Sequence, residues 1–438
     1  MNIPWILFVA LVLFVMFSVL VAAHEYGHYL FARLMGMGID EFAIGMGKRV
    51  KVIGRKTYDL PVPDDYVQPD ETVSEGYGLE GGDMIRHAEL VQTSRGKVLR
   101  ETTDFTYRLL PIGGFVRIKG MIPHDDGREV NIPGGFYSKS PLKRLIVLLA
   151  GPVFSVIAGI ILLTGVYMTD GINKMDNRPI LGGVIVATKD GRYVKPAAQA
   201  GLKPGDEILT ANGEKVRSFT HFVHIVNGSV DKPIYLTYRS DGLTQETILT
   251  PRLDKVAVWK VTDGEYMDPA YEFKEQGAIG VIPLDKTIKP SLGQAALEAL
   301  NAPELAVQGV LRLVSQPSRA KDEAGGAVSM VRMTNEAAKQ GLTSIIALAA
   351  LISISVGIFN LLPVPPLDGG QMLIAFLELL RGGRRLSFKV QTFTIAAGMA
   401  TIVLLTSAFL FIDLQRATES KPPLKVETVQ TTGDAAPR

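Results

Sequence analysis

Residues 4–28 read PWILFVALVLFVMFSVLVAAHEYGH, an almost wholly apolar run that ends in two histidines and a glutamate. Its apolar part, Pro4 to Ala23, has the roughly 20 residues that a helix needs to cross the hydrocarbon core of a bilayer. The run lacks a basic start, is longer than the core of a signal peptide and has no convincing cleavage site before His24. It therefore predicts a retained transmembrane helix that continues towards Met35.

Three further segments have the length and composition of membrane-spanning helices. They cover residues 142–168, 342–362 and 393–412. Basic residues are concentrated from Arg33 to Arg144 and in the short loop that holds Arg381, Arg384, Arg385 and Lys389. Because basic loops stay in the cytoplasm, the N-terminus, the region 182–342 and the C-terminus are predicted on the other side of the membrane.

The composition limits which functions and which metal ligands are available to the chain. The net charge of +2 does not suggest a nucleic-acid binder. The chain has no cysteine, which excludes disulfides and Cys-ligated zinc and leaves His, Asp and Glu as metal ligands.

The segments between the apolar runs differ in pattern. Residues 36–141 predict a β region with a polar insert at about 56–102, and Tyr107 to Lys119 predicts two short strands around a Pro-Ile-Gly-Gly turn. Residues 182–255 predict a compact α+β domain. Residues 256–341 predict a polar connector with one strand near Ile279, then amphipathic helices at the membrane surface. Residues 417–438 predict a disordered tail.

The His24-Glu25-Tyr26-Gly27-His28 motif predicts a zinc site. Positions four apart share one face of a helix, so His24 and His28 can bind one Zn²⁺. Glu25 lies beside them and can act as general base on the metal-bound water. The alternative is a helix that simply ends among lipid headgroups, which would make the spacing a coincidence.

A third ligand is needed, and Asp368 is the best candidate. It follows the third apolar run in Asn360-Leu-Leu-Pro-Val-Pro-Pro-Leu-Asp-Gly-Gly, where prolines break the helix at membrane depth. Asn360 can donate an amide hydrogen bond to a developing oxyanion. The alternative for Asp368 is a cap on a helix that begins near Met372. The other histidines, at positions 87, 124, 221 and 224, are expected on the surface.

Together these motifs resemble the site-2 protease family, in particular its bacterial branch with a PDZ domain. HEYGH is similar to the family's zinc motif, and NLLPVPPLDGG to the motif that supplies the third ligand, here Asp368, and the assisting Asn360. Pro111 to Arg117 is similar to the family's membrane-dipping β-hairpin. The resemblance implies that Gly113, Gly114, Phe115 and Val116 bind substrate as an extended strand. Pro196 to Val216 is similar to a PDZ core.

The resemblance implies a polytopic α-helical membrane protein with four transmembrane helices, a membrane-associated β-hairpin region and one soluble α+β PDZ domain at 182–255. The implied activity is Zn²⁺-dependent cleavage of single-pass membrane proteins, either anti-sigma factors or remnant signal peptides, in the bacterial cytoplasmic membrane. The PDZ domain would lie outside the cytoplasm and either bind peptide C-termini or exclude large substrates.

Two departures from the family pattern stand out. Ser155 occupies a place where the family often has Asn, and Gln371 one where it often has His. Two other functions remain open on the residues alone. One is a catalytically silent scaffold that works through the PDZ domain. The other is a membrane-anchored protease with a soluble active site, for which the sequence after His28 offers no third ligand.

Overall fold

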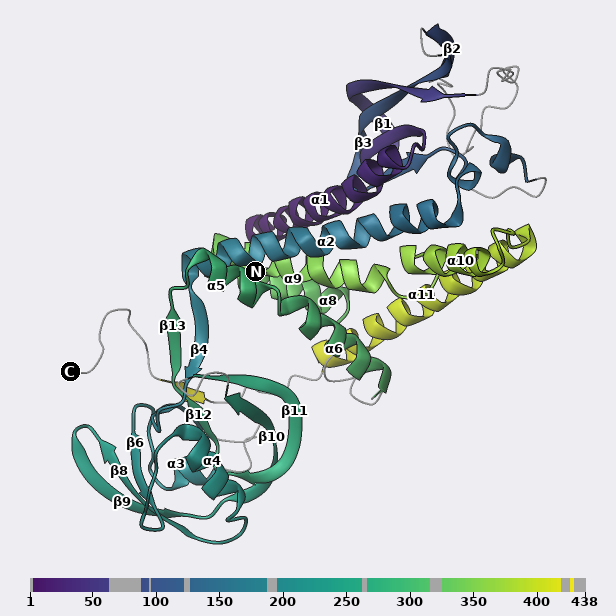
Figure 1. Cartoon of the computed structure of the whole chain (residues 1–438). Helices are drawn as coiled ribbons and strands as arrows, with labels where there is room; N and C mark the ends of the chain where they lie inside the picture. The colour runs from purple at the N-terminus through teal and green to yellow at the C-terminus, as the bar shows by residue number, and fades with distance from the viewer. Residues whose placement is uncertain are drawn as a thin grey trace. The chain divides into compact units, whose positions relative to one another are not determined.

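The computed structural model describes residues 3–62, 88–93, 96–121, 127–186, 195–261, 266–315, 325–418 and 426–428. The chain divides into two compact units (Figure 1). The first consists of Met1–Thr169 and Ser291–Gln415, and the second of Asp170–Pro290 and Arg416–Arg438. His87, His124, most of the polar insert and most of the predicted tail lie outside the described residues.

Four helices of the first unit are long and apolar enough to cross a membrane, counted over the described residues. They are α1 (Ile3–Leu34), α2 (Pro141–Asp170), α9 (Leu342–Asn360) and α11 (Phe388–Thr418). Each lies on one of the four predicted apolar segments. The apolar residues of α1 surround the helix rather than forming one stripe, as expected of a helix whose surroundings are apolar on every side.

Shorter helices complete this unit. They are α5 (Leu292–Ala299), α6 (Ala302–Ser315), α8 (Ala327–Gln340) and α10 (Asp368–Leu380). The α8 helix packs on α1 and α9 through a cluster of Met16, Leu20, Ala337 and Leu348. Residues 361–367 separate α9 from α10, as the prolines there predict, because proline lacks the N–H that would continue the helix.

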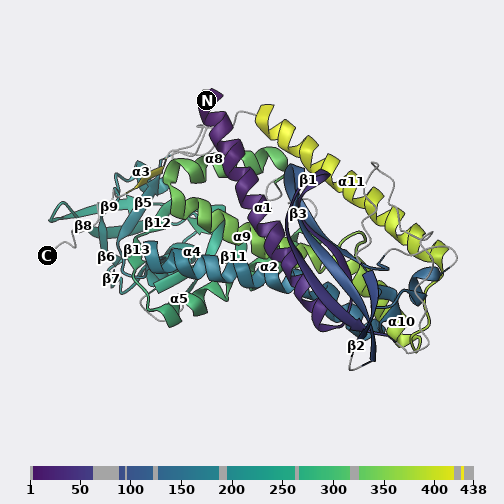
Figure 2. The same cartoon turned by 90° about the horizontal axis from the view of Figure 1, so that it is seen from above.

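A three-stranded antiparallel sheet lies against the C-terminal half of α1 (Figure 2). Its strands are β1 (Ile39–Pro61), β2 (Ala88–Thr93) and β3 (Gly96–Ile118), in the order β1-β3-β2. Residues 41–44 of β1 pair with 104–107 of β3 on one side and with 114–117 on the other, so β3 turns around the end of β1. The strands extend into the sequence expected as a polar loop, because pairing with a partner stabilises a polar strand that shows no apolar alternation.

Two buried acids lie at the centre of this sheet. Glu41 accepts hydrogen bonds from Thr106 and from Arg108, the latter at 2.6 Å. Burial by itself raises the pKa of Glu41, but these hydrogen bonds and the nearby charge of Arg49 outweigh it, so that the pKa is lowered. Asp104 accepts from Arg49 at 3.2 Å. The Glu41 carboxylate also lies 3.6 Å from Nη2 of Arg117, so it connects the two halves of β3 that pair with β1.

The described residues of the second unit form three sheets. One has the order β7-β6-β8-β9, from Glu214–Lys215, Glu207–Ala211, Ile234–Ser240 and Leu243–Leu249. Another has the order β10-β11-β4-β13, from Arg252–Val261, Tyr266–Ala278, Ile172–Asp176 and Asp285–Ile288. The third has the order β12-β5-β14, from Val281–Pro283, Leu181–Ile185 and Val426–Thr428. Residues 256–288 were expected as a connector with one strand near Ile279, but most of their described residues are strand.

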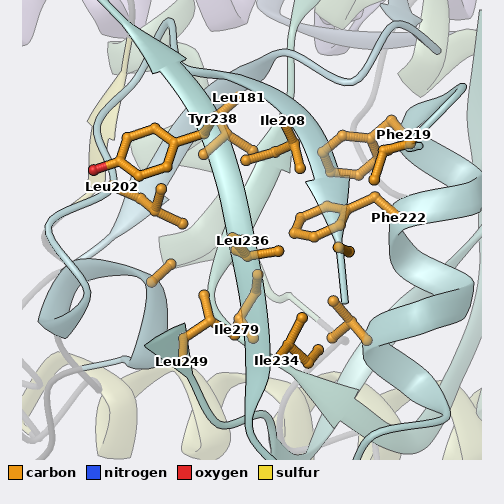
Figure 3. Packing of buried hydrophobic residues seen from close by; sticks show 14 of the residues in the cluster. Leu181, Leu202, Ile208, Phe219, Phe222, Ile234, Leu236, Tyr238, Leu249 and Ile279 are labelled. Atoms are coloured by element: carbon orange, nitrogen blue, oxygen red, sulfur yellow. The ribbon is translucent and has the colours of Figure 1, made fainter. Parts of the chain in front are cut away.

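Two helices, α3 (Pro196–Gln199) and α4 (Phe219–Asn227), accompany these sheets. Phe219 and Phe222 point from α4 towards Ile208 and Leu236 of the strands and build one apolar core (Figure 3). The Ser218 hydroxyl accepts a hydrogen bond from the backbone N–H of His221 and caps α4. The core joins helices and strands of the second unit, whereas the bounds 182–255 and the PDZ fold stay predictions.

Candidate active site

The α1 helix carries the predicted motif within its last three turns. His24 and His28 are both buried, 7% and 8% exposed, and their rings meet edge to face with centroids 4.9 Å apart. The spacing of four residues places both rings on one side of the helix, as the sequence indicates. Two imidazoles in an apolar helix are costly to bury without a partner, so their shared orientation calls for a common ligand.

Asp368 is that partner in the structure. It lies in the first turn of α10, on the C-terminal side of the proline-rich break. One carboxylate oxygen, Oδ2, lies 3.0 Å from Nε2 of His24 and 3.3 Å from Nε2 of His28. Added Cβ atoms on Gly369 and Gly370 would come within 2.4 Å of the preceding loop, so the Gly-Gly pair lets the loop fold tightly onto the start of α10.

The three ligand atoms fit a tetrahedral zinc ion. They lie within 4.8 Å of one another, and the two histidine Nε2 atoms are 3.3 Å apart. Ligands bound to zinc at about 2.0–2.2 Å in tetrahedral geometry are separated by roughly 3.3–3.5 Å. The separations of 3.0–3.3 Å between these ligand atoms are therefore close to the edges of such a tetrahedron. Over the described residues this is the only group of three such side chains close enough to hold a metal.

The α2 helix holds the other side of both imidazole rings. Nδ1–H of His28 donates to the backbone carbonyl of Val147 at 2.9 Å, and a carbonyl can only accept. Nδ1 of His24 lies 2.9 Å from the Ser155 hydroxyl. Each contact occupies Nδ1 and leaves the Nε2 lone pair for a metal, the usual arrangement behind ligating histidines. Ser155 therefore contacts a candidate ligand, although the sequence only marked it as a departure from the family.

Gly151 lets α2 approach His28. A Cβ atom at this position would lie 2.2 Å from Nε2 of His28 and 2.6 Å from its Cε1. Gly27 allows the same approach from α1, since its Cβ would lie 2.5 Å from the carbonyl oxygen of Ala150. The two glycines bring the helix backbones close enough for the hydrogen bond to Val147 to form.

Glu25 lies on the sheet side of α1. Its Oε2 accepts a hydrogen bond from the backbone N–H of Val116 at 2.9 Å. Val116 belongs to the 114–118 segment that the resemblance connects with substrate binding. The structure thus brings Glu25 and this strand together, a contact between residues 91 positions apart that no local pattern reveals.

The remaining predicted residues lie around this centre. Gly114, Phe115 and Val116 pair with β1, and Gly113 has a left-handed φ of 79° at the turn that precedes them. Asn360 is the last residue of α9, where the chain leaves the helix towards Asp368. The catalytic and substrate-binding roles of these residues stay predictions.

An open apolar depression adjoins the motif between α1 and α2, with a volume of about 490 Å³. Ala22, Ala23 and Tyr26 line it from α1, and Phe154 and Ile157 are among the α2 residues on its other side. The depression begins within one helical turn of Glu25, so an apolar segment lying in it would be close to the candidate site.

Replacing Ser155 with Ala is expected to weaken zinc binding. The change removes the hydrogen-bond partner of His24 Nδ1, and loss of such a partner typically costs roughly 10- to 100-fold in metal affinity. Competition with a chromophoric chelator measures the zinc Kd. Ser355→Ala is the matched control, because that hydroxyl donates within its own helix, to the Leu351 carbonyl at 2.8 Å. Equal zinc Kd values for the two variants would contradict the assigned role of Ser155.

The chain is similar to known proteases over most of its length. A model of peptidase family M50 matches residues 12–59 and 89–405. The chain is 30% identical to the regulator of sigma-W protease RasP of Bacillus subtilis, over 92% of this chain and 97% of that protein. It is 28% identical to the zinc metalloprotease RasP of Bacillus licheniformis, over 91% and 97%.

A solved structure of the PDZ domain of an SdrC-like protein from Listeria monocytogenes is similar to 24% of the chain, at 16% identity. Its TM-score of 0.16 is too low to assign a fold to the second unit.

Proposed function

The chain belongs to peptidase family M50 and is a zinc metalloprotease, and from this premise we propose that it cleaves single-pass membrane proteins inside the bilayer. The observation that supports the proposal is the position of the ligand set. His24 and His28 lie in the last three turns of a helix with the length and composition of a membrane span. Asp368 reaches them from the first turn of α10, just after the proline-rich break that follows another such helix. A protease with its site at this depth acts on a peptide bond within an apolar helix.

In this proposal His24, His28 and Asp368 hold the zinc. Zinc, when bound, supplies a Lewis acid that polarises the scissile carbonyl and makes water acidic enough to ionise near neutral pH. Val147 and Ser155 fix the orientation of the two imidazoles through their Nδ1 atoms. The carboxylate of Asp368 adds a negative charge that favours a divalent cation.

Glu25 is proposed as the general base. Its carboxylate takes the proton from the attacking water and delivers it to the nitrogen of the leaving amine. The hydrogen bond from Val116 holds one oxygen, Oε2, and leaves Oε1 to handle the proton. Asn360 is proposed to donate its amide hydrogen to the oxyanion that forms on the scissile carbonyl.

The substrate is proposed to bind as an extended strand. Residues 114–118 pair with β1 along one edge, and within the described sheets no strand pairs with their other edge. A peptide can add there through its backbone, which also unwinds it and exposes a bond that a helix would protect. Gly113 to Val116 would thus position the peptide next to Glu25.

The name of the Bacillus subtilis relative connects that protein with sigma-W. By similarity, we propose that the substrates are single-pass anti-sigma factors or remnant signal peptides in the bacterial cytoplasmic membrane. The topology proposed with it places the basic loop after α10 in the cytoplasm and the second unit outside, following the distribution of Lys and Arg.

Removing the metal tests this function. The chain is reconstituted in lipid nanodiscs with a single-pass reporter that carries the transmembrane segment of an anti-sigma factor. We expect one zinc per chain, and cleavage that stops when 1,10-phenanthroline removes the metal and returns when Zn²⁺ is added. Mass spectrometry of the products locates the cut.

Cuts outside the transmembrane segment, or cleavage that survives loss of the metal, would overturn the proposed function. A silent scaffold would contain no stoichiometric zinc and leave the reporter intact.

A further inference from the structure

A buried ion pair joins α2 to α10 away from the ligands. Arg144 and Glu378 are 2% and 0% exposed, and Nη2 of Arg144 lies 2.7 Å from Oε2 of Glu378. Arg144 lies in the first turn of α2, and its side chain is buried in the protein. The other carboxylate oxygen of Glu378 accepts the N–H of Leu386 at 3.0 Å.

Burying the charges of Arg144 and Glu378 costs free energy of folding. Moving two charges out of water carries a desolvation penalty that often exceeds their attraction, so a buried ion pair is weak evidence for stability. Buried pairs are better explained where they define one arrangement of two elements among several. The aromatic rings of Phe136 and Tyr137 lie 5.8 and 5.0 Å from the Arg144 guanidinium carbon, and hold it in place from the other side.

One face of α2 presents Arg144, Val147, Gly151 and Ser155, spaced by three or four residues. The last three contact His28 or His24. Arg144 contacts the helix that carries Asp368. Ser155 lies eleven positions after Arg144 on α2, which corresponds to about 16 Å of helix. Glu378 lies ten positions after Asp368 on α10, which corresponds to about 15 Å. The ion pair and the ligand cluster are therefore two points of contact between the region of α2 and α10, and the spacing between the two points is nearly the same along both helices.

We propose that Arg144 and Glu378 are a positioning pair that sets the register of α10 against α2, and thereby places Asp368 beside His24 and His28. A slip of one residue along an α-helix moves it by about 1.5 Å and rotates it by about 100°. That rotation turns Asp368 away from the histidines. The inference rests on the proposed ligand set, and it assigns to the ion pair the alignment of ligands from two helices.

A double-mutant cycle tests the pair on the full chain. Zinc Kd and thermal unfolding of the apoprotein are measured for Arg144→Met, Glu378→Leu and the double variant. Each single variant leaves one buried charge unpaired, so it loses both stability and zinc affinity. The double variant removes both charges. We expect it to recover thermal stability while its zinc affinity stays roughly 10- to 100-fold below wild type, because the apolar contact does not define the register.

Two controls separate register from stability. Asp413→Asn weakens the cap on α8, where the carboxylate accepts from Ser329 at 2.7 Å, and it should lower the unfolding temperature without changing the zinc Kd. Arg144→Lys keeps the charge but not the planar guanidinium, and should give an intermediate zinc Kd. The spectrum of bound Co²⁺ reports independently whether Asp368 remains a ligand.

A double variant that binds zinc as tightly as wild type would overturn the proposal. It would show that the ion pair affects folding but not the alignment of Asp368. Should that variant fail to fold, a wild-type zinc Kd for Arg144→Lys together with a wild-type Co²⁺ spectrum would overturn it instead. Asp368→Ala in the same assay tests the proposed ligand set separately from the register. If Asp368→Ala leaves zinc affinity unchanged, the proposed ligand set is wrong rather than the register argument.

Discussion

Replacing Glu25 with Gln is expected to abolish cleavage while one zinc remains bound per chain. The amide has nearly the same shape as the carboxylate, and its oxygen can still accept the Val116 N–H that Glu25 accepts at 2.9 Å. It cannot take up a proton at neutral pH. Loss of a general base costs roughly 10²–10⁴-fold in rate, so turnover in a discontinuous assay should fall to background. Zinc content is measured on the same preparation.

Glu336→Gln is the matched control for this experiment. Glu336 lies on α8, where its exposed carboxylate pairs with Lys339 at 3.0 Å, and the substitution should leave cleavage unchanged. Wild-type turnover by Glu25→Gln would refute the role of Glu25 as base. Loss of zinc from that variant would instead show that Glu25 helps to hold the metal.

The second large effect is expected from Gly151→Ala, a change of one methyl group. The new Cβ would lie 2.2 Å from His28 Nε2, well inside any permitted contact, and its three nearest neighbours all belong to the His28 ring. His28 must rotate away, which removes one of three ligands and breaks its hydrogen bond to Val147. We expect zinc content well below one per chain and no detectable cleavage.

Gly165→Ala supplies the control on the same helix. A Cβ at Gly165 meets nothing within 4 Å, and Ala favours a helix by about 1 kcal/mol over Gly. This variant should therefore keep full zinc content and activity, with equal or higher thermal stability. The proposed geometry of α2 would be incorrect if Gly151→Ala bound zinc normally, because a filled Gly151 and a ligating His28 cannot coexist.

The two experiments fail in different ways, which makes them informative together. Glu25→Gln separates proton transfer from metal binding, whereas Gly151→Ala is expected to remove the metal without replacing a proposed ligand. A scaffold that does not catalyse would show neither effect on cleavage.

The sequence determined the elements that carry the chemistry. The four apolar segments are visible because a membrane span needs about 20 apolar residues in a row, a requirement that any window of the sequence can show. HEYGH can also be recognised from a short stretch of sequence, since helical spacing alone places His24 and His28 on one face. The prolines after Asn360 likewise predict the end of α9, because proline cannot continue a helix.

The sequence was less informative where strands pair over long distances. Residues 56–61, 88–93 and 96–102 were expected in a polar insert, and 256–288 as a connector with one strand, but most of their described residues are strand. Pairing between strands depends on a partner elsewhere in the chain, so polar strands with prolines show no regular pattern.

Only the tertiary structure decided what supports the site. The contact of Glu25 with Val116, the hydroxyl of Ser155 behind His24 and the pairing of Arg144 with Glu378 each join residues far apart in the chain. Local periodicity describes which side of one helix a residue faces, but not which helix lies opposite. Because helix packing sets that choice, the sequence predicted three candidate metal ligands, and the fold determined how their side chains are aligned.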